Sequence, residues 1–124
     1  MYPPLVYIAG PYTAPTVEAV KLNVSAARHL GRLVIDKGWF PLIPHANTYR
    51  FEELVDRPPE FWLKGTLHLM AKCNAVIMTE GWKKSKGATG ELERARELGI
   101  TVYYSVEGLP EITEFNEKHY KDLK

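Results

Sequence analysis

The stretch "NAVIMTEGWKKSKGATGELERARELGITVYYS", residues 74–105, decides the fold class. It begins with a short apolar run at 74–80, which is typical of a buried strand, and it ends with a second strand-like run at 101–105. Between these runs, residues 88–98 have the pattern of an amphipathic helix. A strand, a helix and a strand in this order predict two parallel strands joined by a right-handed crossover.

The same alternation of short apolar runs and longer amphipathic segments extends to both ends of the chain. Further strands are predicted at 5–10 and 39–44, and further helices at 17–37, 60–72 and about 110–120. Thr16 is a suitable N-cap for the helix at 17–37, and Gly38 is a suitable stop. The sum is an α/β fold: a three-layer Rossmann-like or flavodoxin-like domain, residues 1–124, with a parallel sheet of about four strands.

Two segments depart from this alternation. The strand predicted at 39–44 contains two prolines, so we expect it to be short or near an edge of the sheet. Residues 45–59 form the longest irregular segment, which is either a functional loop or a surface excursion.

Composition limits the classes of function. The chain has 124 residues, enough for one core, and its 16 basic and 15 acidic side chains indicate no nucleic acid polymer as partner. The single cysteine, Cys73, rules out an intramolecular disulfide, and no His/Cys spacing resembles a metal site. We expect no metal and no other cofactor. Without a signal peptide or a long apolar run, the expected location is the cytoplasm, with no membrane partner.

Ligands of an open parallel sheet bind outside the carboxyl ends of its strands. The loop after the first strand, "AGPYTA", contains Gly10, which allows close backbone approach, then Pro11 and Tyr12, whose ring could stack on a planar ligand. An ordinary strand-to-helix turn explains the glycine and proline equally well. After the second strand, His45 stands at the same edge and is a candidate ligand contact.

The loop after the third strand combines a hydroxyl, a cation and glycines just before a helix. Ser85, Lys86 and Gly87 could present backbone N–H groups to a phosphate, although exposed loops of this composition are common. Gly81 begins this loop. Trp82 either packs against the core or forms a wall of a base pocket.

Glu91 is the most informative residue of this region. In a helix it shares a face with Ala95 and Leu98, which directs it toward the interior. Ala88, three residues earlier, cannot close a capping box, so the main structural alternative is a first-turn acid favoured by the helix dipole. If Glu91 is functional, we expect an ionised carboxylate in an open cleft, suited to be a nucleophile or to stabilise a cationic centre in glycosyl chemistry.

Two stretches carry a resemblance to a known family. "YIAGPYTA" at 7–14 and "FWLKGTLHLMAKCNAVIMTEGWKKSKGATGELERARELGITVYY" at 61–104 resemble the nucleoside 2-deoxyribosyltransferase-like superfamily, particularly its short phage and bacterial members. The resemblance implies that Glu91 attacks the anomeric carbon of a deoxynucleoside or its monophosphate. It also implies that Ser85 binds the phosphate and that Gly10 and its neighbours line the sugar and base pocket. Relatives form dimers or larger assemblies.

The chain departs from the family pattern at two positions. Thr66 stands where relatives commonly carry an aspartate that orients the sugar or assists proton transfer, and Asn74 replaces a second aspartate. The Thr66 hydroxyl can hydrogen-bond a sugar but cannot act as a carboxylate. Three hypotheses follow: an N-glycosidase or deoxyribosyltransferase, a nucleotide-binding protein without turnover, and a structural or partner-binding domain.

Overall fold

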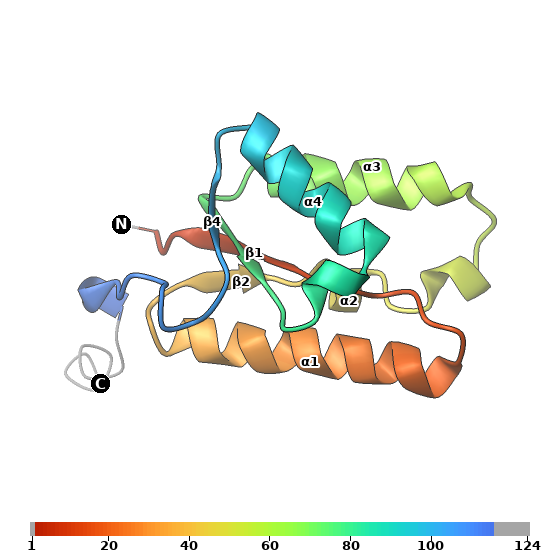
Figure 1. The fold of residues 1–124 in the computed structure, drawn as a ribbon, viewed down its shortest axis with the longest axis horizontal. Helices are drawn as coiled ribbons and strands as arrows, with labels where there is room; N and C mark the ends of the chain where they lie inside the picture. Colours follow the sequence, from red (N-terminus) through yellow and green to blue (C-terminus); the bar gives the residue numbers. More distant parts are fainter. Residues whose placement is uncertain (1, 116–124) are drawn as a thin grey trace.

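The computed structural model describes residues 2–115 (Figure 1). Its centre is a sheet with the strand order β2-β1-β3-β4, in which every pair of neighbours is parallel. The strands are β1 (Leu5–Ala9), β2 (Phe40–Leu42), β3 (Ala75–Met78) and β4 (Thr101–Tyr103). The predicted α/β fold with four parallel strands is therefore confirmed.

Helices cover both faces of the sheet. They are α1 (Val17–Ile35), the short α2 (Pro44–Asn47), α3 (Pro59–Met70) and α4 (Lys86–Glu97), with 3-10 turns η1 (Phe51–Glu53), η2 (Trp82–Lys84) and η3 (Thr113–Phe115). Figure 1 shows α1 along one face and α3 and α4 side by side over the other, which gives the three expected layers. None of the helices within residues 2–115 is both long and apolar enough to cross a membrane.

The alternation of side chains along β1 divides the core between these faces. Val6 and Ile8 point toward α1, whereas Tyr7 and Ala9 point toward α3 and α4. The α1 face is completed by Ala27, Val34, Trp39, Ala75, Ile77 and Leu109. The α3/α4 face is completed by Met70, Cys73, Val76, Met78, Ala88, Leu92 and Ala95.

Both predicted boundaries of α1 are close to those observed. The Thr16 side chain accepts a hydrogen bond from the Ala19 N–H at 3.1 Å, as an N-cap should. Gly38 follows the helix with a φ of 88°, and a Cβ there would lie 2.5 Å from the Ile112 carbonyl oxygen. Glycine is therefore required at this stop for both conformation and space.

The second strand is short and lies at an edge of the sheet, as its prolines predicted. The segment after it is less irregular than expected, because α2 begins with Pro44 at its first helical position and η1 adds a further turn. Helix α4 begins two residues earlier than predicted, because Ser85 caps it.

The helix predicted at about 110–120 is wrong for residues 110–115, and its remainder lies outside the described residues. This segment contains only the turn η3. Two of its backbone groups bond to the α1–β2 junction: the Trp39 indole N–H donates to the Pro110 carbonyl at 2.7 Å, and the Ile112 N–H donates to the Lys37 carbonyl at 2.7 Å. In a helix that begins at Pro110, its carbonyl would instead accept from the N–H four residues later.

Candidate functional site

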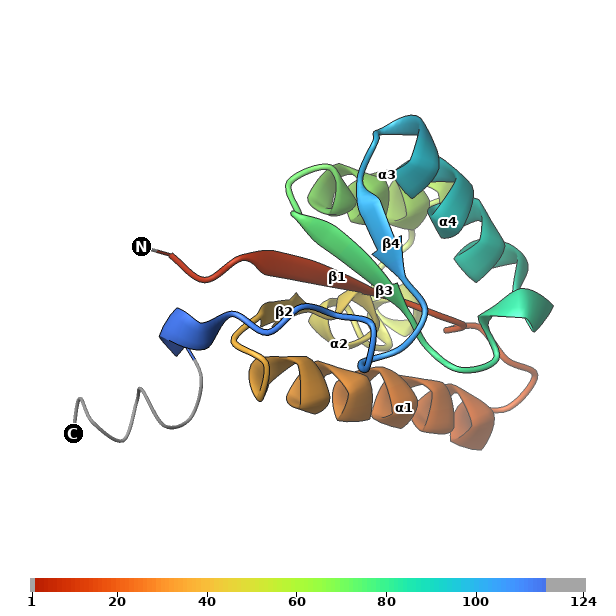
Figure 2. The same cartoon turned by 60° about the vertical axis from the view of Figure 1, so that its left-hand side comes forward.

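The loops after β1 and β3 lie at one edge of the sheet, together with the beginning of α1 and the turn η2 (Figure 2). This is the edge formed by the carboxyl ends of parallel strands, where ligands of such folds bind. The predicted site residues Gly10, Tyr12 and Ser85 all belong to loops or helix starts at this edge. The connectivity of the sheet thus brings two segments that are far apart in the sequence, the β1–α1 and β3–α4 connections, into one region.

A hydrogen bond between β1 and α4 crosses the interior beside this edge. Tyr7 of β1 is fully buried, and its hydroxyl donates to Oε2 of the half-buried Glu91. Glu91 therefore points inward, as predicted, and forms no ion pair within residues 2–115. Tyr7 was not predicted as a site residue. The sequence does contain a signal for Tyr7: it is the only hydroxyl-bearing residue in the apolar run "LVYIA". A buried phenol needs a hydrogen-bond partner, so a polar group is expected opposite it.

Burial dominates the electrostatics of the Tyr7–Glu91 pair. It raises the pKa of Glu91 to about 7, although the Tyr7 hydroxyl and the Gly10 backbone N–H favour the charged form. The pKa of Tyr7 is raised by burial and then by the charge of Glu91, so the phenol keeps its proton and remains a donor.

The ionised carboxylate expected in an open cleft, favoured by nearby N–H groups and the helix dipole, is therefore at odds with the raised pKa, to which burial contributes most. Glu91 is the sixth residue of α4, which begins at Lys86, and the dipole effect is confined to the first turn. The same position removes the alternative that Glu91 is a first-turn acid. The carboxyl of Glu91 therefore interacts with the buried Tyr7 hydroxyl and not with the N-terminus of α4.

The turn after β1, formed by Gly10 and Pro11 and called the glycine turn below, is held from two sides. A Cβ on Gly10 would lie 2.1 Å from Oγ1 of Thr79, so only glycine fits against the end of β3. From the other side, Nε2 of His45 lies 3.0 Å from the Gly10 carbonyl oxygen and 3.0 Å from that of Pro11. His45 is only 5% exposed and contacts this turn instead of open solvent.

Tyr12 is engaged by the connection between β2 and α3. Its hydroxyl donates to Glu52 at 2.9 Å and accepts from the Arg50 N–H at 3.0 Å. Its ring stands edge-on to His45, with 6.1 Å between ring centroids. The structure thus brings Gly10, Pro11, Tyr12 and His45 into one group of contacts.

The second group of predicted residues lies at the beginning of α4. Ser85 is the N-cap and accepts a hydrogen bond from the Ala88 N–H at 3.1 Å, and Gly87 follows it in the first turn. Gly81 precedes η2 with a φ of 85°, and the Trp82 ring packs 5.6 Å from that of Tyr104. No hydrogen bond within residues 2–115 joins this group to the glycine turn.

Thr66 lies on α3 beside the buried phenol, where it lowers the pKa of Tyr7. Its hydroxyl donates to the Leu63 carbonyl at 2.9 Å, and it carries no charge. Asn74 has a structural role, since its Oδ1 accepts from the Leu5 N–H at 2.8 Å and so fixes the start of β1. Thr66 and Asn74, which stand where relatives carry aspartates, therefore supply no carboxylate to Glu91.

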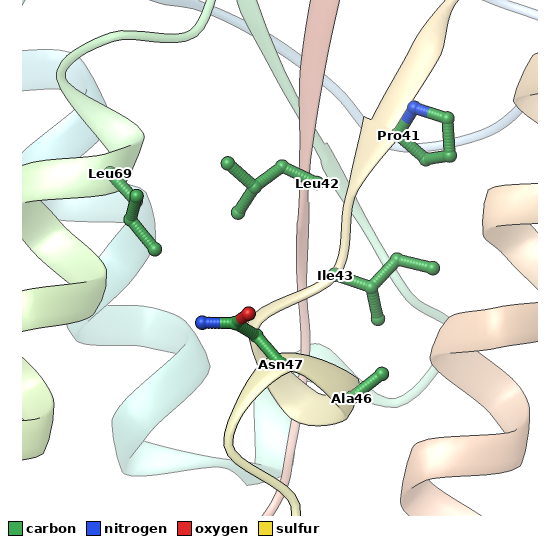
Figure 3. A pocket seen from close by; sticks show the side chains of 6 residues that line it. All are labelled: Pro41, Leu42, Ile43, Ala46, Asn47 and Leu69. Atoms are coloured by element: carbon green, nitrogen blue, oxygen red, sulfur yellow. The ribbon is translucent and has the colours of Figure 1, made fainter.

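A cavity of about 380 Å³ opens at the end of β2. Figure 3 shows Leu42 and Leu69 pointing toward each other across it, with Asn47 of α2 at its lower end. Its lining is Pro41, Leu42, Ile43, Ala46, Asn47 and Leu69. Leu42 is the register neighbour of Tyr7, so the cavity lies one strand away from the Tyr7–Glu91 pair. None of the predicted site residues lines it.

Residues 2–115 contain no group of three His, Cys, Asp or Glu side chains placed to hold a metal ion. A search of curated proteins found no match to the chain. The family model described as "Domain of unknown function (DUF7768)" matches residues 4–105. That range includes β1, β4, the glycine turn and Glu91, and the chain belongs to this family.

Proposed function

We propose that the protein cleaves or transfers the N-glycosidic bond of a deoxynucleoside or its 5′-monophosphate, with Glu91 as nucleophile. The observation that carries this proposal is the Tyr7–Glu91 pair, an inward-facing carboxyl that accepts a hydrogen bond from a phenol and has no ion-pair partner within residues 2–115. A buried carboxyl of this kind costs stability and is typical of functional sites. The resemblance of residues 7–14 and 61–104 to the nucleoside 2-deoxyribosyltransferase-like superfamily supports the same role.

The reaction proceeds in two steps. A carboxylate oxygen of Glu91 forms a bond to the anomeric carbon as the bond to the base nitrogen breaks, and the base leaves with the electron pair and takes a proton from solvent. Water then attacks the anomeric carbon and gives up a proton to solvent as the bond to Glu91 breaks, which completes hydrolysis and restores the carboxylate. If a second base attacks instead, the result is transfer. Tyr7 orients the carboxylate through its hydroxyl in both steps.

Ser85 is proposed as the phosphate contact. It lies six residues before Glu91, which corresponds to about 9 Å of helix rise and leaves room for a deoxyribose between the two residues. Its oxygen accepts the capping bond, while its hydroxyl proton remains available to a phosphate oxygen. The exposed Lys83, Lys84 and Lys86 add positive charge around this helix terminus.

A second candidate function is nucleotide binding without turnover. The observation that favours it is Thr66, an uncharged residue beside Tyr7 whose hydroxyl is already bonded within α3. No other carboxylate of the described residues contributes to the pKa shift of Glu91. Without a second carboxyl group beside Glu91, no carboxylic acid is placed there to protonate the leaving base, and turnover would be slow.

In either case the proposed partner is a small nucleoside or nucleotide, and the proposed assembly is a homodimer or larger. Exposed apolar side chains on η1, on α3 and between them offer a surface for self-association: Phe51, Leu54, Val55, Phe61 and Leu63. Sedimentation velocity at several concentrations tests this assembly, and a monomer at all concentrations contradicts it.

The function is tested by incubating the protein with deoxynucleosides and their monophosphates, with and without an acceptor base. Release of free base, or formation of a new nucleoside, is followed by chromatography. The proposal expects activity in the wild type and none in Glu91→Ala. If both are inert on the full panel, the enzymatic proposal fails, and titration calorimetry on the same compounds tests the binding function.

A further inference from the structure

One imidazole nitrogen holds both carbonyl groups of the glycine turn. Carbonyl oxygens only accept hydrogen bonds, so Nε2 of His45, at 3.0 Å from those of Gly10 and Pro11, must carry the proton that is shared between them. Nδ1 is then the unprotonated nitrogen of a neutral ring. Burial lowers the pKa of His45, which favours the same neutral form.

The glycine turn fixed in this way also affects the charge of Glu91. The Ala9 carbonyl accepts the Thr79 N–H at 2.8 Å, so the peptide group that carries the Gly10 N–H is anchored to β3. That N–H favours the ionised Glu91 carboxylate. The next two carbonyls of the chain are those held by His45. The direction of the Gly10 N–H therefore depends on bonds from β3 on one side and from α2 on the other.

We propose that His45 is a positioning residue, which acts on Glu91 by clamping the glycine turn through a bifurcated Nε2–H. It does not touch the substrate. The inference rests on the proposed function, because the group it positions is the proposed nucleophile. It assigns to His45 a role different from the ligand contact expected at the end of β2.

The other ring nitrogen argues against simple packing. Nδ1 of His45 is buried and has no hydrogen-bond partner within residues 2–115. A buried unpaired acceptor costs stability, and an apolar side chain of similar size would avoid this cost. An apolar side chain, however, could not donate to two carbonyls at once. The free-energy cost of burying the unpaired Nδ1 is therefore explained if the function of the protein requires the Nε2–H of His45.

The wild-type protein provides the first test, which needs no variant. Long-range ¹H–¹⁵N NMR distinguishes protonated from bare imidazole nitrogens, and His45→Gln identifies the His45 signals by their loss. The proposal expects a protonated Nε2 and a bare Nδ1 at pH 8, where the ring is neutral. A protonated Nδ1 with a bare Nε2 would overturn it.

The second test compares His45→Gln with His45→Ala. The glutamine amide nitrogen occupies the place of Nε2 and keeps a donor, whereas alanine removes it. The Glu91 carboxyl is titrated by ¹³C NMR, with Glu91→Gln identifying its signal. We expect the midpoint of Glu91 to rise by about one pH unit in His45→Ala and to stay near the wild-type value in His45→Gln.

Activity supplies a separate readout of the same clamp. We expect kcat to fall about tenfold to a hundredfold in His45→Ala, with KM changed less, and to be largely restored in His45→Gln. An unchanged Glu91 midpoint in folded His45→Ala overturns the inference, and so does equal damage from both substitutions. If the wild type is inert on all substrates, the proposed function fails, while the titration still decides the role of His45.

Discussion

The two faces of strand β1 bury their side chains in opposite ways. Toward α1, Val6 and Ile8 are fully buried aliphatic residues in a cluster whose other members are also largely apolar. Toward α3 and α4, Tyr7 is equally buried but directs a hydroxyl at the carboxyl of Glu91. The same strand thus supports an apolar interior on one face and a polar pair on the other.

This difference separates what the fold needs from what the site needs. The α1 face demonstrates that apolar packing alone can cover one side of this sheet. The Tyr7–Glu91 pair is not required for that purpose, and its burial raises the pKa of Glu91 at a cost in stability. Departures from apolar packing in an otherwise consistent core are expected at functional positions.

The largest expected effect comes from removing the carboxylate on the α3/α4 face. Glu91→Gln keeps the shape of the side chain but cannot attack the anomeric carbon, so base release should fall by about a thousandfold or more. Glu93→Gln is the matched control, because Glu93 is exposed on the same helix. Equal rates in Glu91→Gln and the control would place the chemistry elsewhere.

The pH dependence of stability should also distinguish the two faces. Burial raises the pKa of Glu91 from 4.5 to about 7, so the native state binds more protons than the unfolded state between these values. The contribution is fully present below pH 4.5 and is lost as pH rises through 7. The free energy of unfolding of the wild type, relative to Glu91→Gln, should fall by about 2 kcal/mol from pH 5 to pH 8. Urea unfolding measures it, and parallel pH profiles would contradict the assigned burial.

A matched pair of conservative substitutions on β1 sharpens the comparison further. Tyr7→Phe and Ile8→Val should each cost about 1 kcal/mol of stability, the first by losing a hydrogen bond and the second a methyl group. Only Tyr7→Phe should raise the Glu91 pKa further, since the phenol favours the carboxylate. The rate of base release should therefore rise with pH through about 7 in the wild type and Ile8→Val. In Tyr7→Phe the same rise should come about one unit higher. Identical pH–rate profiles for Tyr7→Phe and Ile8→Val would show that Tyr7 does not influence the reaction.

The smallest effect is expected at the start of α4. Asparagine and aspartate both cap helices well, so Ser85→Asn and Ser85→Asp should preserve stability within about 0.5 kcal/mol. The added charge in Ser85→Asp should raise KM for monophosphates about tenfold by repulsion, with little change for nucleosides. Steady-state kinetics on a nucleoside and its monophosphate test this, and equal losses on both would remove Ser85 from the phosphate role.

The strands and α1 could be predicted from sequence because their signals are local. Apolar runs mark the strands, and Thr16 and Gly38 mark the ends of α1. The start of α4 was placed late because its apolar pattern begins at Ala88, whereas its cap is Ser85. Residues 110–115 follow tertiary bonds to the α1–β2 junction, which no local pattern records.

The candidate site was predictable only in part. The inward direction of Glu91 follows from helical spacing, and Gly10 follows from its place after a strand. The partner of Glu91 is 84 residues away, so Tyr7 becomes visible only when the strand order is known. The raised pKa of Glu91 was missed for a related reason, since burial depends on α4 lying over β1.

The central claim is that Glu91 forms a covalent bond to the sugar. Acid quenching of the enzyme during turnover of a deoxynucleoside, followed by trypsin digestion and mass spectrometry, tests it directly. Cleavage after Lys86 and Arg94 releases "GATGELER", whose two carboxylates are Glu91 and Glu93. The account predicts a deoxyribosyl adduct on Glu91, located by fragmentation and absent in Glu91→Gln. An adduct on Glu93 or on another peptide, or turnover with inversion at the anomeric carbon and no adduct, would contradict it.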